Sequence, residues 1–254
     1  MKKNLLLLSL LCCSLSAVQA QKKEHYEIKV YHVKTAEQVK QVDEFLKSAY
    51  LPALHKIGIK QIGVFHHTDI DTAGDKRIFV FIPLRSLEQS EEVEDLVIKD
   101  PSIQSQPYWN SEYNAAPFNR IETILLKSFA LNPNWKAPEL TGNKTERVYE
   151  LRSYEGPNER LYRKKVEMFN EGGEIALFKR LNFNAVFYAE VIAGSRQPNL
   201  MYMTSFNNRA DRDAHWKTFG DDPEWNKLKV MPQYLNTVSR NDTMLLNPTE
   251  FSEI

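Results

Sequence analysis

The chain repeats itself, and this repeat constrains its fold more than any other feature. Residues 25–29 read His-Tyr-Glu-Ile-Lys and residues 148–152 read Val-Tyr-Glu-Leu-Arg, so a tyrosine, a glutamate and a cation recur in the same spacing. Four later blocks recur in the same order and at nearly the same offset. They are Gly63–His66 with Ala185–Tyr188, Arg77–Ile82 with Asn199–Thr204, Asp100–Pro101 with Asp222–Pro223, and Arg120–Leu126 with Arg240–Leu246. Such a series indicates a duplicated unit.

Each copy predicts the element order strand, helix, strand, strand, helix, strand. Residues 26–30 alternate apolar and polar side chains, which is the period of a strand that packs one face. Thr35 and Gln38 match a capping box, and apolar residues at three- and four-residue steps predict a helix behind it. In the second copy the helical pattern starts near Pro157 and is interrupted by the glycine pair at 172–173.

Asp-Pro pairs and a linker complete this organisation. Asp100 and Asp222 are suited to cap a helix, because each precedes a proline that fits the first helical position. Residues 131–145 contain two prolines and a glycine without any periodicity, and we interpret them as the linker between the copies. The first unit then spans residues 21–130 and the second spans residues 146–254.

In the inner strands of each copy, large apolar residues occur at both odd and even positions, so they point to both faces of the sheet. Both faces must therefore be covered. One face packs against the helices of its own unit. The other needs a partner, because an exposed apolar sheet face of this size is an association surface. We therefore expect the two sheets to face each other with helices outside, and the space between the sheets is a candidate pocket.

Residues 1–20 have the features of a secretory signal. Lys2 and Lys3 precede an apolar run from Leu5 to Val18, and Ala20 is suited to a cleavage site. The run is shorter than the roughly 20 residues that cross a bilayer. We expect a chain that is exported, to the periplasm or as a secreted protein, after cleavage near Ala20. No later stretch is apolar enough to form a transmembrane segment.

Composition excludes several functions. The only cysteines, Cys12 and Cys13, lie in the signal segment, so the cleaved chain has no disulfide, thiol nucleophile or thiolate metal site. The chain has 33 basic and 33 acidic residues, and a protein that binds nucleic acid through its phosphates usually has a basic excess. We expect no nucleic-acid partner, no metal ion and no resident cofactor.

The second copy carries a family resemblance. Residues 148–154, Val-Tyr-Glu-Leu-Arg-Ser-Tyr, and residues 211–217, Asp-Arg-Asp-Ala-His-Trp-Lys, resemble the NIPSNAP family, as does the later Asp-Pro-Glu-Trp at 222–225. The first copy departs from the pattern, with Glu-Ile-Lys at 27–29. The resemblance implies the dimeric α+β barrel superfamily. The expected fold is α+β, with two tandem ferredoxin-like (βαββαβ) units that form an intramolecular dimeric α+β barrel.

The resemblance leaves two functions open, because that superfamily includes haem-degrading monooxygenases, chlorite dismutases, cofactor-free quinone-forming monooxygenases and members without known catalysis. The first is a binding or interaction module that holds a small hydrophobic or aromatic ligand between its two sheets. The alternative is a cofactor-free or haem-dependent monooxygenase-type enzyme that acts on an aromatic substrate. The sequence favours the first, because no catalytic set converges in it. A homo-oligomer is compatible with both.

Two histidines and a tyrosine at strand two are candidate site residues. His66 and His67 are adjacent, so their side chains point to opposite faces of a strand, and one of them is a candidate axial ligand for haem or a ligand-binding residue. The other interpretation is a strand-end pair, one solvated and one hydrogen-bonded. Tyr188 falls opposite His66 in the repeat and is a candidate catalytic residue.

The helix that follows strand three of the second copy contributes His215 and Trp216. The acidic and basic residues at 211–213 lie close enough to tune His215 for proton transfer, which makes it a catalytic candidate. Trp216 is a ligand-binding candidate. The alternative is a charged helix face that Trp216 anchors to the sheet.

Lys29 and Arg152 occupy matching positions on the two first strands. Paired cations near a barrel mouth would orient an anionic or carbonyl ligand, so both are binding candidates and Arg152 is also a catalytic one. The alternative is that each cation pairs with a neighbouring glutamate, such as Glu27 or Glu150.

Overall fold

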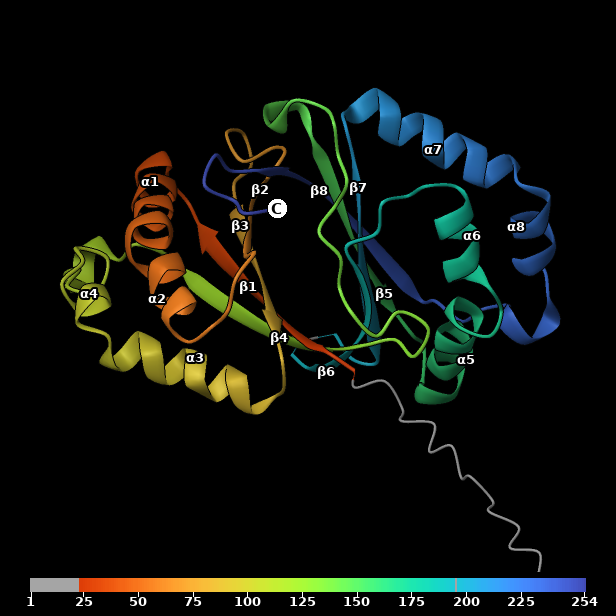
Figure 1. Cartoon of the computed structure of the whole chain (residues 1–254), viewed down its shortest axis with the longest axis horizontal. Helices are drawn as coiled ribbons and strands as arrows, with labels where there is room; N and C mark the ends of the chain where they lie inside the picture. Colours follow the sequence, from red (N-terminus) through yellow and green to blue (C-terminus); the bar gives the residue numbers. More distant parts are fainter. Residues whose placement is uncertain (1–22, 195) are drawn as a thin grey trace, which may run out of the picture.

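An eight-stranded closed barrel forms the centre of the protein, and helices cover it on two opposite sides (Figure 1). The computed structural model describes residues 23–194 and 196–254. The predicted signal segment 1–20, with Cys12 and Cys13, lies outside the described residues. The strands are β1 (His25–Val33), β2 (Gly63–His67), β3 (Lys76–Leu84), β4 (Arg120–Ser128), β5 (Val148–Glu155), β6 (Phe187–Ala193), β7 (Asn199–Phe206) and β8 (Arg240–Pro248).

The barrel is built from two equivalent four-stranded sheets. The strand order is β1-β3-β2-β8-β5-β7-β6-β4, so each unit contributes one continuous sheet and the units join at two seams, β2 with β8 and β4 with β6. All pairings between neighbouring strands are antiparallel. This arrangement confirms the expected α+β fold of two tandem ferredoxin-like units in an intramolecular barrel. Closure also removes free sheet edges, which would otherwise pair with other chains.

The helices of each unit lie outside its own sheet, those of the first unit on one side of Figure 1 and those of the second on the other. They are α1 (Ala36–Phe45), α2 (Leu51–Lys56), α3 (Glu88–Lys99), α4 (Pro101–Gln104), α5 (Glu159–Phe169), α6 (Glu174–Arg180), α7 (Arg209–Asp221) and α8 (Pro223–Leu228). A π-helical turn, Leu46–Tyr50, joins α1 to α2. Three 3₁₀ turns are Tyr113–Ala115, Lys144–Glu146 and Pro232–Tyr234.

The helix starts follow the predicted capping chemistry. Thr35 and Gln38 form the complete capping box of α1. Asp100 and Asp222 cap α4 and α8 with their side chains, and the next residue of each helix is proline. The glycine pair at 172–173 separates α5 from α6, because Gly173 has a φ of 92° that a helix interior does not accommodate.

The barrel interior is a packed core of side chains. Alternate residues of all eight strands point inward and are almost completely buried. They include Tyr26, Ile28, Phe65, Phe81, Leu126, Tyr149, Leu151, Phe187, Met203 and Leu246. The rings of Phe81 and Phe187, which come from different units, stack with centroids 5.2 Å apart and an interplanar angle of 4°. The space predicted between the two sheets is therefore filled for most of its length, because aromatic side chains from both sheets meet across it.

The linker closes one end of the barrel. Trp135 and Leu140 pack against the interior residues, and the Trp135 ring centroid lies 6.0 Å from that of Phe81. The Trp135 backbone amide donates to Glu24 Oε2 at 2.8 Å, which ties the linker to the start of the first unit. The C-terminal Ile254 packs against the same core. The opposite end, where β1 and β5 end and β3 and β7 begin, is called the barrel mouth below.

The strand register corrects one expectation from the repeat. Phe79 matches Met201 in the two sheets, but Phe79 pairs with Phe65 whereas Met201 pairs with Ala189. Tyr188 is therefore level with Val64, and the predicted equivalence of Tyr188 with His66 is wrong by two residues. The β6–β7 hairpin is offset by two residues from the β2–β3 hairpin. An even offset keeps each side chain on its face of the sheet, so the apolar pattern alone does not reveal it.

The packed interior predicts a large stability loss on truncation of Phe81. Phe81→Ala removes ring contacts with Tyr26, Trp135 and Phe187, so we expect the free energy of unfolding to fall by about 3–5 kcal/mol. Denaturant unfolding followed by circular dichroism measures this loss. Tyr113→Ala is the control, because Tyr113 is fully exposed and its loss should change stability by less than about 0.5 kcal/mol. Equal effects of the two substitutions would contradict a packed interior.

Candidate functional site

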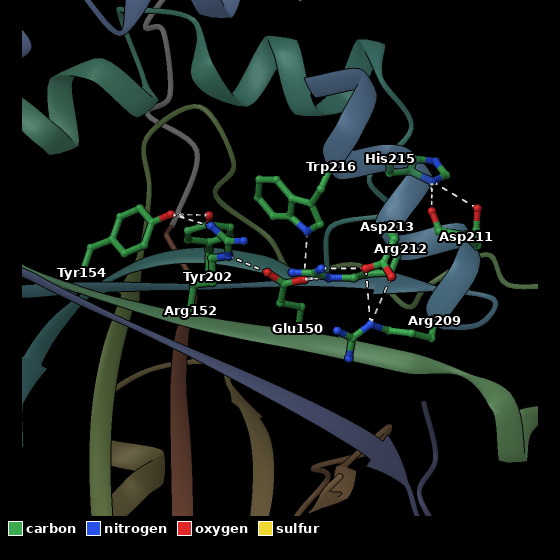
Figure 2. A network of polar contacts seen from close by, with 10 residues as sticks. All are labelled: Glu150, Arg152, Tyr154, Tyr202, Arg209, Asp211, Arg212, Asp213, His215 and Trp216. Atoms are coloured by element: carbon green, nitrogen blue, oxygen red, sulfur yellow. Dashed lines mark hydrogen bonds and ion pairs between the residues drawn. The ribbon is translucent and has the colours of Figure 1, made fainter. Parts of the chain in front are cut away.

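A buried glutamate organises several of the predicted residues. Glu150 lies on the helix-facing side of β5 and is completely buried. Its Oε1 accepts a hydrogen bond from Arg152 Nε at 2.5 Å. Its Oε2 accepts from Arg212 Nε at 2.6 Å and from Trp216 Nε1 at 2.8 Å. Arg212 and Trp216 are one turn apart on α7, so this helix presents both donors to the same carboxylate (Figure 2).

The surroundings of Glu150 keep it ionised. Burial alone would raise the pKa of this carboxyl, but the hydrogen bonds and positive charges of Arg212 and Arg152 lower its pKa below the ordinary value. The Arg152 guanidinium also lies 3.7 Å from the centroid of the Trp216 ring, a cation–π contact. Both carboxylate oxygens are therefore occupied, and Glu150 positions Arg152 and Trp216 rather than presenting a free base.

Two tyrosines extend this network. Arg152 Nη1 donates to Tyr154 Oη at 3.0 Å, and the hydroxyls of Tyr154 and Tyr202 are 3.0 Å apart (Figure 2). Burial is the main reason that the pKa of Tyr202 lies well above its usual value, so its phenol stays neutral. The network runs from α7 through β5 to β7 and holds the helix on the sheet.

The first copy contains a counterpart of the Glu150 network. Glu27 is completely buried, its Oε2 accepts from Ser90 Oγ at 2.6 Å, and Lys29 Nζ lies 3.4 Å from its Oε1. Lys29 also bonds to Glu94 at 2.5 Å. Burial opposes the charge on Lys29, but Glu27 and the neighbouring acidic groups raise its pKa. Each predicted cation thus lies beside a glutamate two residues earlier on its own strand.

The repeated sequence pattern includes one more residue of this network, a tyrosine. Tyr31 and Tyr154 recur at the same spacing from Glu27 and Glu150, so the repeated pattern is Tyr-Glu-x-cation-x-Tyr. The last tyrosine of this pattern was not among the predicted site residues.

His215 is not part of the Glu150 network. Its Nδ1 lies 2.8 Å from the Asp211 carbonyl oxygen and 3.1 Å from Asp211 Oδ1. The ring packs against Phe183 and Phe206, with centroids 5.6 and 5.5 Å away. Figure 2 shows His215 and Asp211 apart from the residues around Glu150. The structure brings Arg152 and Trp216 together but does not place His215 against either.

Tyr188 lies in the helix-facing core of the second unit. Its ring stacks on that of Tyr202 with centroids 5.7 Å apart, and burial raises its pKa well above the usual value. It also borders a cavity of about 390 Å³ between the linker and the loop that follows α6, together with Phe178 and Phe183. This cavity is separate from the barrel interior.

His66 and His67 point to opposite faces, as adjacent strand residues do. His66 Nε2 lies 2.9 Å from Asp43 Oδ1 of α1, on the helix-facing side. It borders an open groove of about 500 Å³ between α1 and the C-terminal residues 249–251. His67 lies at the end of β2, where Nδ1 hydrogen-bonds to Asp69. His66 therefore does not reach the barrel interior.

One cavity does reach the barrel interior, at the barrel mouth. Its volume is about 130 Å³, and inward-facing apolar side chains from five strands line it: Val30, Phe79, Ile124, Met201 and Met244. Two buried polar residues, Ser153 and Asn199, complete the wall. Asn199 Nδ2 donates to Ser153 Oγ at 2.9 Å. Here side chains leave a part of the predicted inter-sheet pocket open.

Charged residues form the rim of the barrel mouth. His32 Nδ1 lies 2.9 Å from Asp75 Oδ1, and His32 Nε2 lies 3.1 Å from Glu122 Oε1. The guanidinium of Arg77 also borders the cavity and lies 5.7 Å from the centroid of the Phe79 ring.

The second unit contributes a matching set of ion pairs to the rim. Arg196 hydrogen-bonds to Asp242, and Arg240 Nε lies 3.2 Å from Asp242 Oδ1. Both arginines also lie within 3.9 Å of Glu155 Oε1. Burial would raise the pKa of Asp242, but the two arginines lower it.

Comparison with protein families finds a match for the second unit. The NIPSNAP family model matches residues 149–253. The second half of this chain matches the NIPSNAP domain. The match spans β5 to β8 and includes Glu150, Arg152 and Trp216, so the Glu150 network lies within the matched segment. The expected family resemblance is confirmed for this half.

Solved structures share the fold of both units. A proposed monooxygenase from Fusobacterium nucleatum subsp. nucleatum has a TM-score of 0.60 at 7% identity, covering 90% of this chain and 93% of that one. A proposed monooxygenase from Lactobacillus acidophilus NCFM has a TM-score of 0.56 at 14% identity, covering 89% and 94%. An anthrone oxidase-like protein has a TM-score of 0.54 at 10% identity, covering 91% and 93%. Comparison with curated protein sequences finds no match.

Residues of both units line the barrel mouth, and they were not predicted as a site from the sequence. Their signal is a change of polarity along the inward face of a strand. Val30 is followed two residues later by His32, and Phe79 is preceded by Arg77. Ile124 is likewise preceded by Glu122. An inward face that turns charged at the strand end marks the end of a barrel.

Residues 23–194 and 196–254 contain neither a cluster of metal ligands nor a membrane-spanning helix. No three His, Cys, Asp or Glu side chains there converge to hold a metal ion. In the same described part, no helix has both the length and the apolar character needed to cross a membrane.

The Glu150 network predicts a pH-dependent contribution to stability. Glu150→Gln leaves two arginines without their carboxylate, and we expect unfolding free energy at pH 7 to fall by about 2–4 kcal/mol. The pKa of Glu150 is lowered on folding, so its contribution is complete above the ordinary pKa of 4.5 and is lost as pH falls through the folded value. The difference between wild type and variant should therefore shrink below about pH 4.5. Urea unfolding at pH 7, 5, 4 and 3 measures it.

Glu171→Gln is the matched control for this measurement, because Glu171 is exposed and lies in the turn after α5. It should change stability by less than about 0.5 kcal/mol at each pH. A difference between wild type and Glu150→Gln that stayed constant from pH 7 to pH 3 would contradict the ionised network.

Proposed function

We propose that the chain is an exported NIPSNAP-like binding protein that holds a small hydrophobic or aromatic ligand at the barrel mouth. The cavity at the barrel mouth carries the proposal. Val30, Phe79, Ile124, Met201 and Met244 belong to the interior core, yet they border open volume there. Apolar walls with a few polar groups are typical of small-molecule sites.

The size of the cavity limits the ligand. An apolar protein cavity of roughly 150 Å³ holds one benzene molecule. The cavity at the barrel mouth, at about 130 Å³, therefore suits a single aromatic ring or an alkyl group of similar size. Fused rings do not fit without displacing Met201 or Met244. This is smaller than the ligand space expected between the sheets, because side chains such as Phe81 and Phe187 occupy the centre.

Because the end of the barrel opposite the mouth is closed, we propose that the ligand enters through the barrel mouth. Trp135, Leu140 and Ile254 pack against the core at the end opposite the barrel mouth. A ligand that enters at the mouth meets charged side chains first and apolar ones below, so we propose that it enters with its apolar part leading.

The alternative of a monooxygenase-type enzyme draws support from the fold alone. The neighbours described as monooxygenases are 14% identical or less, and such a likeness does not carry an activity to this chain.

Export is part of the proposal and rests on the sequence of the N-terminal segment. Lys2, Lys3 and the apolar run from Leu5 to Val18 are typical of a secretory signal, and the cleaved chain would contain no cysteine. A binding protein without cysteines forms no disulfides, so its fold does not depend on whether its compartment oxidises thiols.

Ligand binding at the barrel mouth is testable with a size series. We expect toluene and phenol to bind the wild-type protein in ligand-observed NMR titrations, and two- and three-ring aromatics to bind at least tenfold more weakly. Ile124→Trp should weaken single-ring binding at least tenfold, because the indole occupies the cavity. Ile192→Trp is the matched control: Ile192 is an exposed strand residue outside the cavity, and its substitution should leave binding unchanged. Single-ring binding that Ile124→Trp leaves intact, in a variant that melts cooperatively, would contradict the proposal.

A further inference from the structure

We propose that the ligand of the barrel mouth is a small aromatic carboxylate and that Arg77 binds its carboxylate group. This inference rests on the proposed function and adds the chemical class of the ligand. In the part of the chain that the structure describes, the charged side chains at the rim are paired with one another except for Arg77, and this difference is the basis of the proposal.

The rim carboxylates are all engaged. His32 faces Asp75 with one ring nitrogen and Glu122 with the other, at 2.9 and 3.1 Å. On the second unit, Arg196 and Arg240 share Asp242 and Glu155. The second set pairs two arginines with two carboxylates, and in the first set both carboxylates are hydrogen-bonded to His32, so each rim carboxylate already has a protein partner.

Arg77 is the rim cation that these pairings leave over. His32 and Arg77 are directly opposite each other on β1 and β3, and both border the cavity. Asp75 and Glu122, the acidic residues of the first unit that border the cavity, both hydrogen-bond to His32. Among the described residues, Arg77 makes no ion pair or hydrogen bond through its guanidinium, which lies 5.7 Å from the centroid of the Phe79 ring.

The position of Arg77 suits a carboxylate attached to an aromatic ring. A guanidinium binds a carboxylate through two parallel hydrogen bonds, and such charge-assisted bonds are stronger than those between neutral groups. Phe79 lies two residues further along the inward face of β3 and forms part of the apolar wall. A ring against Phe79 and Val30 would therefore place its carboxylate at the level of Arg77.

The second unit breaks the symmetry at this level. In the sheet register, Arg77 of β3 corresponds to Asn199 of β7, and Val30 of β1 corresponds to Ser153 of β5. Asn199 and Ser153 are buried, neutral and hydrogen-bonded to each other. The unpaired positive charge is thus on one side of the cavity, and a ligand with one anionic end has a single favoured orientation.

Benzoate and benzamide provide a matched pair of probes, because they have nearly the same shape and differ in charge. We expect wild-type protein to bind benzoate at least tenfold more tightly than benzamide in isothermal titrations at pH 7. Arg77→Gln should weaken benzoate binding about tenfold or more and leave benzamide binding unchanged. Arg85→Gln is the control, since Arg85 follows the opposite end of the same strand and should alter neither affinity.

The outcomes separate this inference from the proposed function. If both probes bind equally and Arg77→Gln changes neither, the barrel mouth binds aromatic rings but the carboxylate class is overturned. If Arg77→Gln weakens both probes by the same factor, Arg77 shapes the site without recognising charge, and the inference fails as well. If neither probe binds and toluene does not bind either, both proposals are overturned.

Discussion

The structure depends on mutual burial of two apolar sheet faces. Each unit has helices on one face of its sheet. The other face carries Phe, Tyr, Met and Leu side chains, whose exposure to water would cost free energy. The two sheets meet along the β2–β8 and β4–β6 seams, and Phe81 of one unit stacks on Phe187 of the other. Because this contact fills the centre of the barrel, polar chemistry is confined to the helix layers and to the barrel ends.

These two locations have different characters. In the helix layers, Glu27 and Glu150 bind cations and connect a helix to the sheet. Their carboxylate oxygens are hydrogen-bonded to protein groups or buried, so they are not available to a ligand. These buried charges have a structural role: they fix the geometry of the helix on the sheet, while the net contribution of such an ion pair to the free energy of folding is modest. At the barrel mouth the charges surround an apolar cavity instead, and Arg77 has no hydrogen-bond or ion-pair partner for its guanidinium among residues 23–194 and 196–254. The repeat therefore preserves the glutamate networks, whereas the barrel mouth differs between the units.

Much of the fold could be predicted from the sequence, because duplication, strand alternation and helix caps are local or periodic signals. Thr35, Asp100 and Asp222 cap the helices where the pattern placed them, and Glu27 and Glu150 lie beside the matching cations. The two-residue offset of the β6–β7 hairpin was not predictable, since it leaves the faces of Tyr188 and its neighbours unchanged. The barrel mouth was missed because its residues come from the ends of six strands and from loops, and only closure of the barrel brings them together.

The location of a bound ligand tests this account most directly. A crystal structure with 4-bromobenzoate would place the halogen by its anomalous scattering and the carboxylate by ordinary density. The account predicts one molecule at the barrel mouth, with bromine against Met201 and Met244 and the carboxylate on Arg77. A molecule in the groove beside His66, in the cavity beside Tyr188, or between Phe81 and Phe187 in the barrel centre would contradict it.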